Sequence, residues 1–175
     1  MPHATVLHSE PKVFQAFRSA HIEEPQMSEA APLVLELRND VAELARLSEA
    51  VDEFCAAHGL PPKMAFSLNL VLEEVVVNVI NYAFPDAGPY SIHVALALAD
   101  GCVRGEVRDT GKAFDPLLLA PPKLDLDLEQ RAVGGLGVHF LKTLMDEVAY
   151  TRKNGQNCLQ FAKNTESGVA PDTED

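Results

Sequence analysis

The sequence has few cysteines, and none of them lie close together. Cys55, Cys102 and Cys158 are far apart in the chain, and no Cys-x-x-Cys pair occurs. Zinc sites and disulfide frameworks both rely on repeated cysteines at regular spacing. The spacing therefore argues against both kinds of site. We expect reduced thiols in a reducing compartment, and hence a cytoplasmic protein.

Features that direct a chain into or across a membrane are lacking as well. The N-terminus has no basic start followed by an apolar run, so no signal peptide is expected. The longest apolar stretch is interrupted by Glu73, Glu74 and Asn78, and it falls short of the ~20 apolar residues that span a bilayer. The pattern therefore predicts no membrane association.

Positive charge is scarce. Lysine and arginine number 14 against 26 acidic residues, which gives a net charge of −12 at pH 7. A chain this acidic is poorly suited to the phosphate backbone of a nucleic acid or to an anionic lipid surface. We therefore expect protein or small-molecule partners and no direct contact with nucleic acid. An anionic ligand such as a nucleotide would need local backbone donors or a cation.

The stretch from Ser67 to Phe84 predicts a helix that is more apolar than a surface helix. Its apolar residues recur at the spacing of a helix that buries one broad face; they are Leu68, Val71, Leu72, Val75, Val76, Val79 and Ile80. Glu74, Asn78 and Asn81 recur along a different line, so they stack on one side. Polar groups in apolar surroundings are costly unless something satisfies them. We therefore expect this helix to form the floor of a site.

The remaining sequence predicts one domain with a peripheral segment at each end. Residues 1–31 are interpreted as an N-terminal leader, flexible or partly helical. Residues 32–164 are interpreted as the domain and residues 165–175 as an acidic tail. Within the domain, residues 112–133 form a long, proline-containing connection, which predicts a lid.

The domain is predicted to contain about five strands and three long helices. Asp100-Gly101 and Asn154-Gly155 predict hairpin turns, and no strand–helix–strand rhythm repeats. Strands are expected near residues 33–37, 91–99, 102–107, 147–152 and 157–163, and helices near 41–58, 62–84 and 138–145. We predict an α+β two-layer sandwich, with a mixed, mostly antiparallel sheet and the three main helices on one face.

The first candidate site is the pair Glu74 and Asn78. Four residues make one helical turn, so the carboxylate and the carboxamide lie close together. An amide oxygen suits Mg²⁺, which fills its other positions with water and nucleotide phosphates. A neighbouring carboxylate can deprotonate a nucleophile. The alternative is a solvated Glu73–Glu74 pair beside a structural asparagine.

The second candidate is the stretch of residues 109–116, Asp-Thr-Gly-Lys-Ala-Phe-Asp-Pro. A buried carboxylate at Asp109 can accept a hydrogen bond from an exocyclic amino group such as that of adenine. Gly111 lets a purine approach the backbone closely. An aspartate followed by a glycine at a strand end is also common turn composition, so a plain turn is the alternative.

The third candidate is Gly134-Gly135-Leu136-Gly137, ahead of a helix. Glycines expose backbone N–H groups and the helix N-terminus adds partial positive charge, so anions bind at such places. The stretch is neither a Walker A loop nor a Rossmann fingerprint, because no strand precedes it and the Gly-Lys-Ser/Thr ending is absent. The alternative is a helix start without a ligand.

In their order and spacing, the three candidates together resemble the nucleotide site of the GHKL superfamily. That superfamily includes DNA gyrase, the ninety-kilodalton heat-shock chaperone, sensor histidine kinases and mismatch-repair ATPases. The chain is most similar to its bacterial anti-sigma-factor serine/threonine kinases, over residues 33–163. The stretches EEVVVNVINYAFPD, DTGKAFDP and GGLGVHFLKTLMDEVAYTR carry the resemblance. It implies the Bergerat ATP-binding fold, with ATP and Mg²⁺ as cofactors.

The resemblance also implies roles for single residues. Asn78 matches the Mg²⁺-binding asparagine, and Glu74 matches the carboxylate proposed as general base for the serine or threonine of a protein substrate. Asp109 matches the aspartate that binds adenine, and Gly111 matches the glycine beside it. The metal and the lid would then act by positioning and charge neutralisation.

At the phosphate end, Gly135 and Gly137 match the family's glycines. Arg131 falls where a basic residue can meet the γ-phosphate. Two positions depart from the family pattern: Tyr82 stands where several relatives have histidine, and Ala113 replaces a frequent proline. Neither change removes a ligand.

The resemblance predicts an ATP-dependent serine/threonine protein kinase and anti-sigma-type regulator. Its implied substrate is a small anti-anti-sigma-like protein in a partner-switching pathway, with a sigma factor as a second partner. Relatives commonly form homodimers. The alternative is a nucleotide-dependent module that sequesters a regulator without phosphorylating it. Glu74 favours the kinase, because a domain without this carboxylate would bind nucleotide but lack the base.

Overall fold

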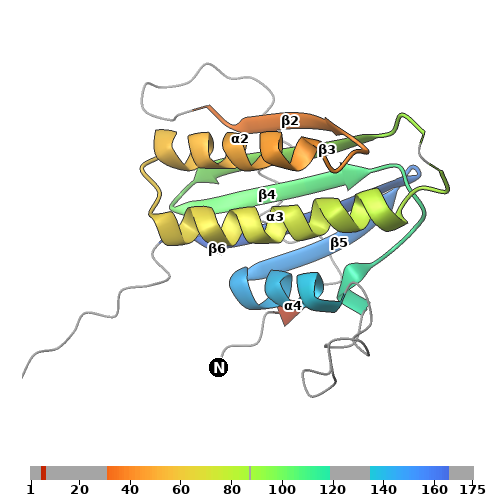
Figure 1. Ribbon diagram of the computed structural model, residues 1–175. Coiled ribbons are helices and arrows are strands. Elements are labelled where there is room, and N and C mark those ends of the chain that lie inside the picture. The colour runs from red at the N-terminus through yellow and green to blue at the C-terminus, as the bar shows by residue number, and fades with distance from the viewer. Residues whose placement is uncertain (1–4, 7–30, 87, 119–134, 166–175) are drawn as a thin grey trace, which may run out of the picture.

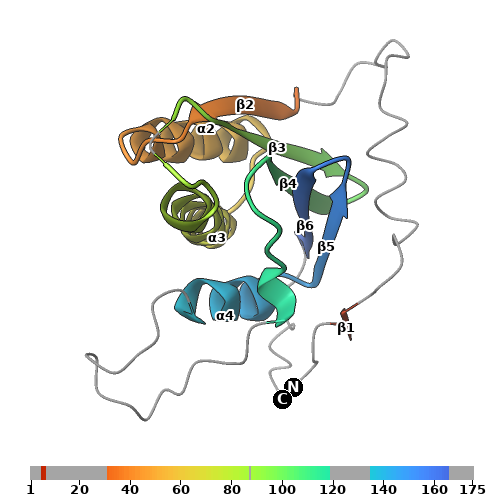
Figure 2. The same cartoon turned by 90° about the vertical axis from the view of Figure 1, so that its right-hand side faces the viewer.

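The computed structural model describes residues 5–6, 31–86, 88–118 and 135–165. In this part of the chain, helices cover one face of a sheet, as the two views in Figure 1 and Figure 2 show. The strands are β1 (Thr5–Val6), β2 (Leu33–Arg38), β3 (Ser91–Ala99), β4 (Cys102–Asp109), β5 (Glu147–Lys153) and β6 (Gln156–Asn164). The helices are α2 (Glu43–Ala57), α3 (Pro62–Tyr82) and α4 (Gly135–Leu144), with a 3₁₀ turn η1 (Pro116–Leu118). The predicted α+β sandwich is confirmed.

The sheet has six strands in the order β1-β5-β6-β4-β3-β2. Strands β2 to β6 pair antiparallel with their neighbours, and β1 pairs parallel with β5 at one edge. The sheet is therefore mixed and mostly antiparallel, as predicted. Within the predicted leader, the structure describes residues 5 and 6 as the short strand β1, and the prediction for the leader as a whole stays untested. These residues pair with the edge of β5, which offers unpaired backbone groups.

Two tight turns set the register of the sheet. Asp100 and Gly101 have φ values of 52° and 68°, and Asn154 and Gly155 have φ values of 53° and 79°. Positive φ at both central residues is typical of a type I′ turn, whose twist matches that of the strands it joins. Both predicted hairpin turns are confirmed. Each joins neighbouring antiparallel strands, β3 to β4 and β5 to β6.

Alternation along the strands places three polar side chains on the helix side of the sheet. Val103 and Val107 of β4 are buried in the core, and Asp109 follows with the same period of two. Asp109 pairs with Asn157 on β6, and Asn157 pairs with Arg152 on β5. Because directly opposed residues point to the same face, these three side chains meet beneath the helices.

Helix α3 lies between α2 and α4 over the sheet (Figure 2). Leu68, Val71, Leu72 and Val76 on this helix have no exposed surface. Burying a side chain of this size contributes about 1.5–3 kcal/mol relative to leaving it exposed. By length and composition alone α3 is apolar enough to cross a membrane, which the sequence did not lead us to expect. Its contacts with the sheet and with both neighbouring helices account for this apolarity, as in a core helix.

Candidate functional site

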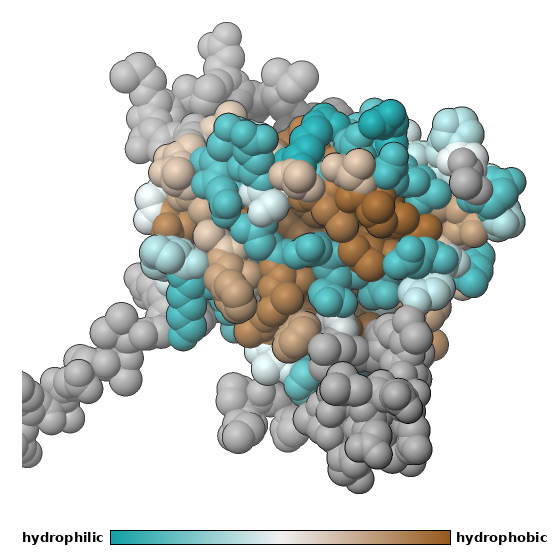
Figure 3. Space-filling model, in the orientation of Figure 1, coloured by the Kyte–Doolittle hydropathy of each residue, from teal (hydrophilic) through white to brown (hydrophobic). Residues whose placement is uncertain are grey.

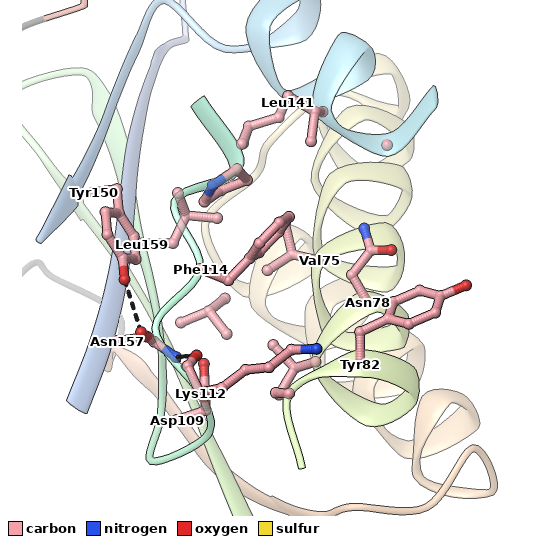
Figure 4. A pocket seen from close by; sticks show the side chains of 16 residues that line it. Val75, Asn78, Tyr82, Asp109, Lys112, Phe114, Leu141, Tyr150, Asn157 and Leu159 are labelled. Carbon is pink, nitrogen blue, oxygen red and sulfur yellow. Dashed lines mark hydrogen bonds between the residues drawn. The ribbon is translucent and has the colours of Figure 1, made fainter. Parts of the chain in front are cut away.

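A pocket of about 620 Å³, including its opening to solvent, lies between α3, α4, the segment after β4 and the sheet (Figure 4). Its apolar lining comprises Val75, Val79, Ala83, Val107, Phe114, Pro116, Val138, Leu141 and Leu159. The other lining residues are Asn78, Tyr82, Asp109, Lys112, Gly137, Tyr150 and Asn157. A mostly apolar cleft with a few polar groups is typical of a small-molecule site. The structure thus brings Asn78, Asp109 and Gly137, one from each predicted patch, to the same pocket.

The carboxylate of Asp109 lies at the sheet end of the pocket, with only 5% of the residue exposed. Its Oδ1 accepts hydrogen bonds from the backbone N–H of Gly111 at 2.7 Å and from Nδ2 of Asn157 at 2.8 Å. No other described residue donates to this carboxylate. The second oxygen, Oδ2, therefore remains an acceptor available to a ligand. This confirms that Asp109 lies buried in a pocket, and its partner Asn157 was not predicted.

Asn157 is buried and uses its amide fully. Its Oδ1 accepts a hydrogen bond from the Tyr150 hydroxyl at 2.7 Å and another from Nη1 of Arg152 at 2.5 Å. Its Nδ2 donates to Asp109 and, at 3.0 Å, to the backbone carbonyl of Lys112. One signal in the sequence points to this residue: Asn157 shares the core-facing period of Leu159 and Phe161, where an apolar residue is expected.

Gly111 is needed for the contact between the segment after β4 and the end of α3. A Cβ at this position would lie 2.5 Å from the Cβ of Ala83 and 2.6 Å from its carbonyl oxygen. The same carbonyl accepts a hydrogen bond from the backbone N–H of Lys112 at 2.8 Å. Gly111, which was predicted to let a purine approach, also lets the backbone after β4 contact the backbone of Ala83 at the end of α3.

We expect Gly111→Ala to destabilise the fold by about 1–3 kcal/mol, the usual cost of overpacking a tight contact. The atoms in the way are the Cβ and the backbone carbonyl of Ala83, directly after α3, and they cannot rotate away as the end of a long side chain can. Thermal unfolding measures the effect, since each kcal/mol lowers Tm by about 2–4 °C in a chain of this size. Thr110→Ala, at the exposed neighbouring position, is the control. An unchanged Tm for Gly111→Ala contradicts the tight contact.

The first turn of α4 lies against α3 at the pair Glu74 and Asn78. A Cβ at Gly137 would lie 2.6 Å from Oε2 of Glu74 and 3.3 Å from Nδ2 of Asn78. Gly135 and Gly137 belong to the first turn of the helix rather than to a loop ahead of it, which corrects the predicted start at Val138. The first and third predicted patches are therefore neighbours, because a small residue lets the two helices approach.

Glu74 and Asn78 are half-buried polar side chains without a partner in the described part of the chain. Asn78 lines the pocket, whereas Glu74 lies behind Gly137 and does not. Polar groups at partly buried positions lose hydrogen bonds to water and gain from a ligand that replaces them. Arg131 and residues 119–133 of the predicted lid lie outside the described residues, so these predictions stay untested.

The mouth of the pocket is formed by three exposed side chains. Tyr82 and Phe114 have 42% and 44% of their surface exposed. Lys112 is exposed beside them, and Figure 4 shows its side chain extended toward α3. Figure 3 shows further apolar surface between polar patches on the helix side. The aromatic rings offer stacking surface to a planar ligand, and Lys112 supplies positive charge in an otherwise acidic chain.

Cysteine chemistry and a protein-only metal cluster find no support in the described ranges. Burial raises the pKa of Cys55 to about 11. Burial, together with the nearby Glu106 carboxylate, raises the pKa of Cys158 to about 12. Both thiols are therefore protonated at neutral pH and are poor nucleophiles. Within the same ranges, no three His, Cys, Asp or Glu side chains are grouped to hold a metal ion. A metal at Asn78 would have to share a ligand's oxygens.

Comparison with known proteins agrees with this geometry. A serine/threonine-protein kinase, BtrW, of Bordetella bronchiseptica is 28% identical over 103 residues, which cover 59% of this chain and 72% of that protein. A serine-protein kinase, RsbW, of Listeria monocytogenes is 25% identical over 126 residues, which cover 70% of this chain and 79% of that protein. These relatives are kinases by name, as the resemblance predicted.

Among solved structures, the RsbU and RsbW domains of a Mycobacterium tuberculosis protein match with a TM-score of 0.56 and 21% identity. The match covers 77% of this chain and 32% of that one, so it supports the fold alone. The family model of the histidine kinase-like ATPase domain matches residues 37–163. This range includes all the residues that line the pocket. The chain therefore belongs to the histidine kinase-like ATPase family.

Proposed function

We propose that this protein binds ATP with Mg²⁺ in the cytoplasm and transfers the γ-phosphate to a serine or threonine of a small anti-anti-sigma-like protein. The observation that carries the proposal is the pocket itself. Its lining holds an available carboxylate oxygen on Asp109 and the carboxamide of Asn78, and Glu74 lies beside the lining residue Gly137. Neither Glu74 nor Asn78 has a partner among the described residues. The names of the two kinase relatives support the same reaction.

The residues present suit an adenine nucleotide. The apolar side chains of α3, β4 and β6 match a purine ring, and Asp109 Oδ2 can accept from its amino group. The first turn of α4 offers backbone N–H groups to phosphate oxygens. The carboxamide of Asn78 lies beside this turn through its Nδ2 and has no partner among the described residues. Its oxygen is a hard ligand of the kind that Mg²⁺ prefers. Bound there, Mg²⁺ would neutralise phosphate charge in a chain with net charge −12.

In the proposed reaction Glu74 acts as the general base. Its carboxylate accepts the proton of the substrate hydroxyl as that oxygen bonds to the γ-phosphorus. The bond from the γ-phosphorus to the bridging oxygen of ADP breaks, and ADP leaves with the electron pair. The protein's other contributions are positioning and charge: Asp109 would bind the adenine ring, the first turn of α4 would bind the phosphates, and Lys112 adds positive charge to the pocket lining.

One observation favours the alternative, a module that binds nucleotide and sequesters a regulator such as a sigma factor. Gly137 lies against Oε2 of Glu74, so the first turn of α4 crowds one side of the carboxylate that would receive the proton of the substrate hydroxyl. A domain in which this turn keeps substrate away from Glu74 would bind ATP without transferring phosphate. The two functions therefore differ in what ATP does to this contact.

Incubation with γ-labelled ATP, Mg²⁺ and candidate small partners with a regulatory serine tests the proposal. Label that appears on a partner supports the kinase. Nucleotide binding without transfer to any cognate partner supports the sequestering module. Absence of nucleotide binding in a calorimetric titration contradicts both functions.

We expect Asn78→Ala to weaken Mg²⁺-dependent nucleotide binding by roughly tenfold or more, the size of loss that follows disturbance of a metal's surroundings. Calorimetric titration with ADP, with and without Mg²⁺, measures the change. Asn81→Ala, an exposed asparagine near the end of the same helix, is the matched control. An Asn78→Ala protein whose affinity still rises with Mg²⁺ as in the wild type excludes Asn78 as the ligand.

A further inference from the structure

The orientation of the Asn157 amide is determined by its four neighbours. Arg152 can only donate hydrogen bonds, and it faces Oδ1. The carbonyl of Lys112 can only accept, and it faces Nδ2. If the oxygen and nitrogen of this amide were exchanged, the NH₂ group would face the donor on Arg152 and the amide oxygen would face the carbonyl oxygen of Lys112. The amide therefore presents its NH₂ group to Asp109.

This fixed amide in turn determines what Asp109 can offer a ligand. An NH₂ group bound to Oδ1 at 2.8 Å requires that oxygen to be an acceptor. The backbone N–H of Gly111 also donates a hydrogen bond to Oδ1, at 2.7 Å, so this oxygen must accept from both groups. These two donors leave no room for a proton on Oδ1, and Oδ2 is the carboxylate oxygen left to accept a hydrogen bond from a ligand. Arg152 strengthens the arrangement, because its second contact, to the carbonyl of Gly111 at 3.0 Å, holds the guanidinium in place.

A carboxylate that can only accept discriminates between purines. A 6-amino group donates to it, whereas a 6-oxo group places an oxygen lone pair against it. Leaving a buried charged acceptor without its donor weakens binding, because the lost contact with water is not replaced. We infer that Asn157, held by Arg152 and Tyr150, is a positioning residue that makes the pocket prefer a 6-amino purine nucleotide over its 6-oxo counterpart. This inference rests on the proposed nucleotide binding.

ADP and IDP are the probes, because they differ only in this part of the base. We expect the wild-type protein to bind ADP about a hundredfold more tightly than IDP in calorimetric titrations, because IDP leaves the buried carboxylate oxygen without its donor. In Asn157→Asp two carboxylates lie within hydrogen-bonding distance and share one proton. Asp109 can then donate to a 6-oxo group, and we expect the ADP/IDP ratio to fall to about tenfold or less.

Arg152→Met is the second variant, and it remains informative if Asn157→Asp does not fold. Arg152 is exposed, so its loss leaves the core intact. Without this donor the amide of Asn157 can turn over, because the Tyr150 hydroxyl either donates or accepts. We expect an ADP/IDP ratio between those of the wild type and Asn157→Asp. Arg152→Lys, which keeps a donor, should recover most of the preference.

Lys153→Met and Asn81→Asp are the matched controls. Asn81→Asp makes the same change as Asn157→Asp, and Lys153→Met removes a positive charge next to Arg152. Both positions are exposed and do not line the pocket, so both variants should keep the wild-type ratio. An unchanged ratio in Arg152→Met and in folded Asn157→Asp overturns the inference while nucleotide binding stands. Equal affinity of the wild-type protein for ADP and IDP also overturns the inference while nucleotide binding stands. A wild-type protein that binds neither contradicts the proposed function and the inference with it.

Discussion

Replacing Glu74 by glutamine is expected to reduce phosphate transfer to a protein partner by about 10²–10⁴-fold, the contribution of a positioned general base. Glutamine has nearly the same shape, so it keeps the contact with Gly137, but it cannot take the proton of the substrate hydroxyl. Glu74 does not line the pocket. Binding of ADP with Mg²⁺ should therefore be unchanged, which separates this variant from Asn78→Ala.

The measurement pairs transfer of label from γ-labelled ATP with calorimetric titration of ADP. Glu73→Gln is the matched control, because Glu73 is the exposed neighbour on the same helix and carries the same charge. Transfer that persists in Glu74→Gln assigns the base to another residue. Loss of ADP binding together with transfer assigns Glu74 a role in holding the two helices rather than in the reaction.

Much of the fold follows from local patterns in the sequence. The Asp100-Gly101 and Asn154-Gly155 turns are visible because few residues other than glycine, asparagine and aspartate tolerate positive φ. The apolar periodicity of α3 is visible because a central helix must bury most of its surface. The turns and the helix depend on residues that are close together in the chain, so the sequence alone is enough to predict them.

The contacts that complete the candidate site depend on residues far apart in the chain. Asn157 reaches Asp109 because β6 pairs with β4 in one register, and a shift of one residue would turn Asn157 away. Gly137 meets Glu74 because α4 packs on α3 at that turn. The sequence identifies Asp109, Gly137 and Glu74 as candidates one by one. It does not show which side chains contact them, since that depends on strand register and helix packing.

The structure also separates the two ends of the pocket by how firmly they are held. At the sheet end, Asp109, Asn157 and the backbone of Gly111 are joined by hydrogen bonds between strands and the segment after β4. At the other end, Glu74 and Asn78 have no partners among the described residues, and only helix packing sets their surroundings. A preformed sheet end suits recognition of a base. Side chains that have no hydrogen bond to another described residue suit a group whose partners change during a reaction.

The rigidity of the sheet end gives Asp109→Asn a large expected effect. Oδ1 of the new side chain stays on its two donors, the N–H of Gly111 and the amide of Asn157, so the fold is retained. The NH₂ group then replaces Oδ2 and meets the 6-amino group of adenine as donor against donor. We expect ADP binding to weaken by about a hundredfold or more, because the site can neither accept from the base nor turn its amide over.

The same geometry predicts a reversal of preference, which calorimetric titration with ADP and IDP measures. An NH₂ group in place of Oδ2 can donate to a 6-oxo group, so Asp109→Asn should bind IDP more tightly than ADP. Asp100→Asn, an exposed aspartate in the β3–β4 turn, makes the same chemical change away from the pocket and suits the positive φ there. Equal loss of ADP and IDP binding in Asp109→Asn would show that this carboxylate supports the pocket without distinguishing bases. Retained ADP affinity would place recognition of the base elsewhere.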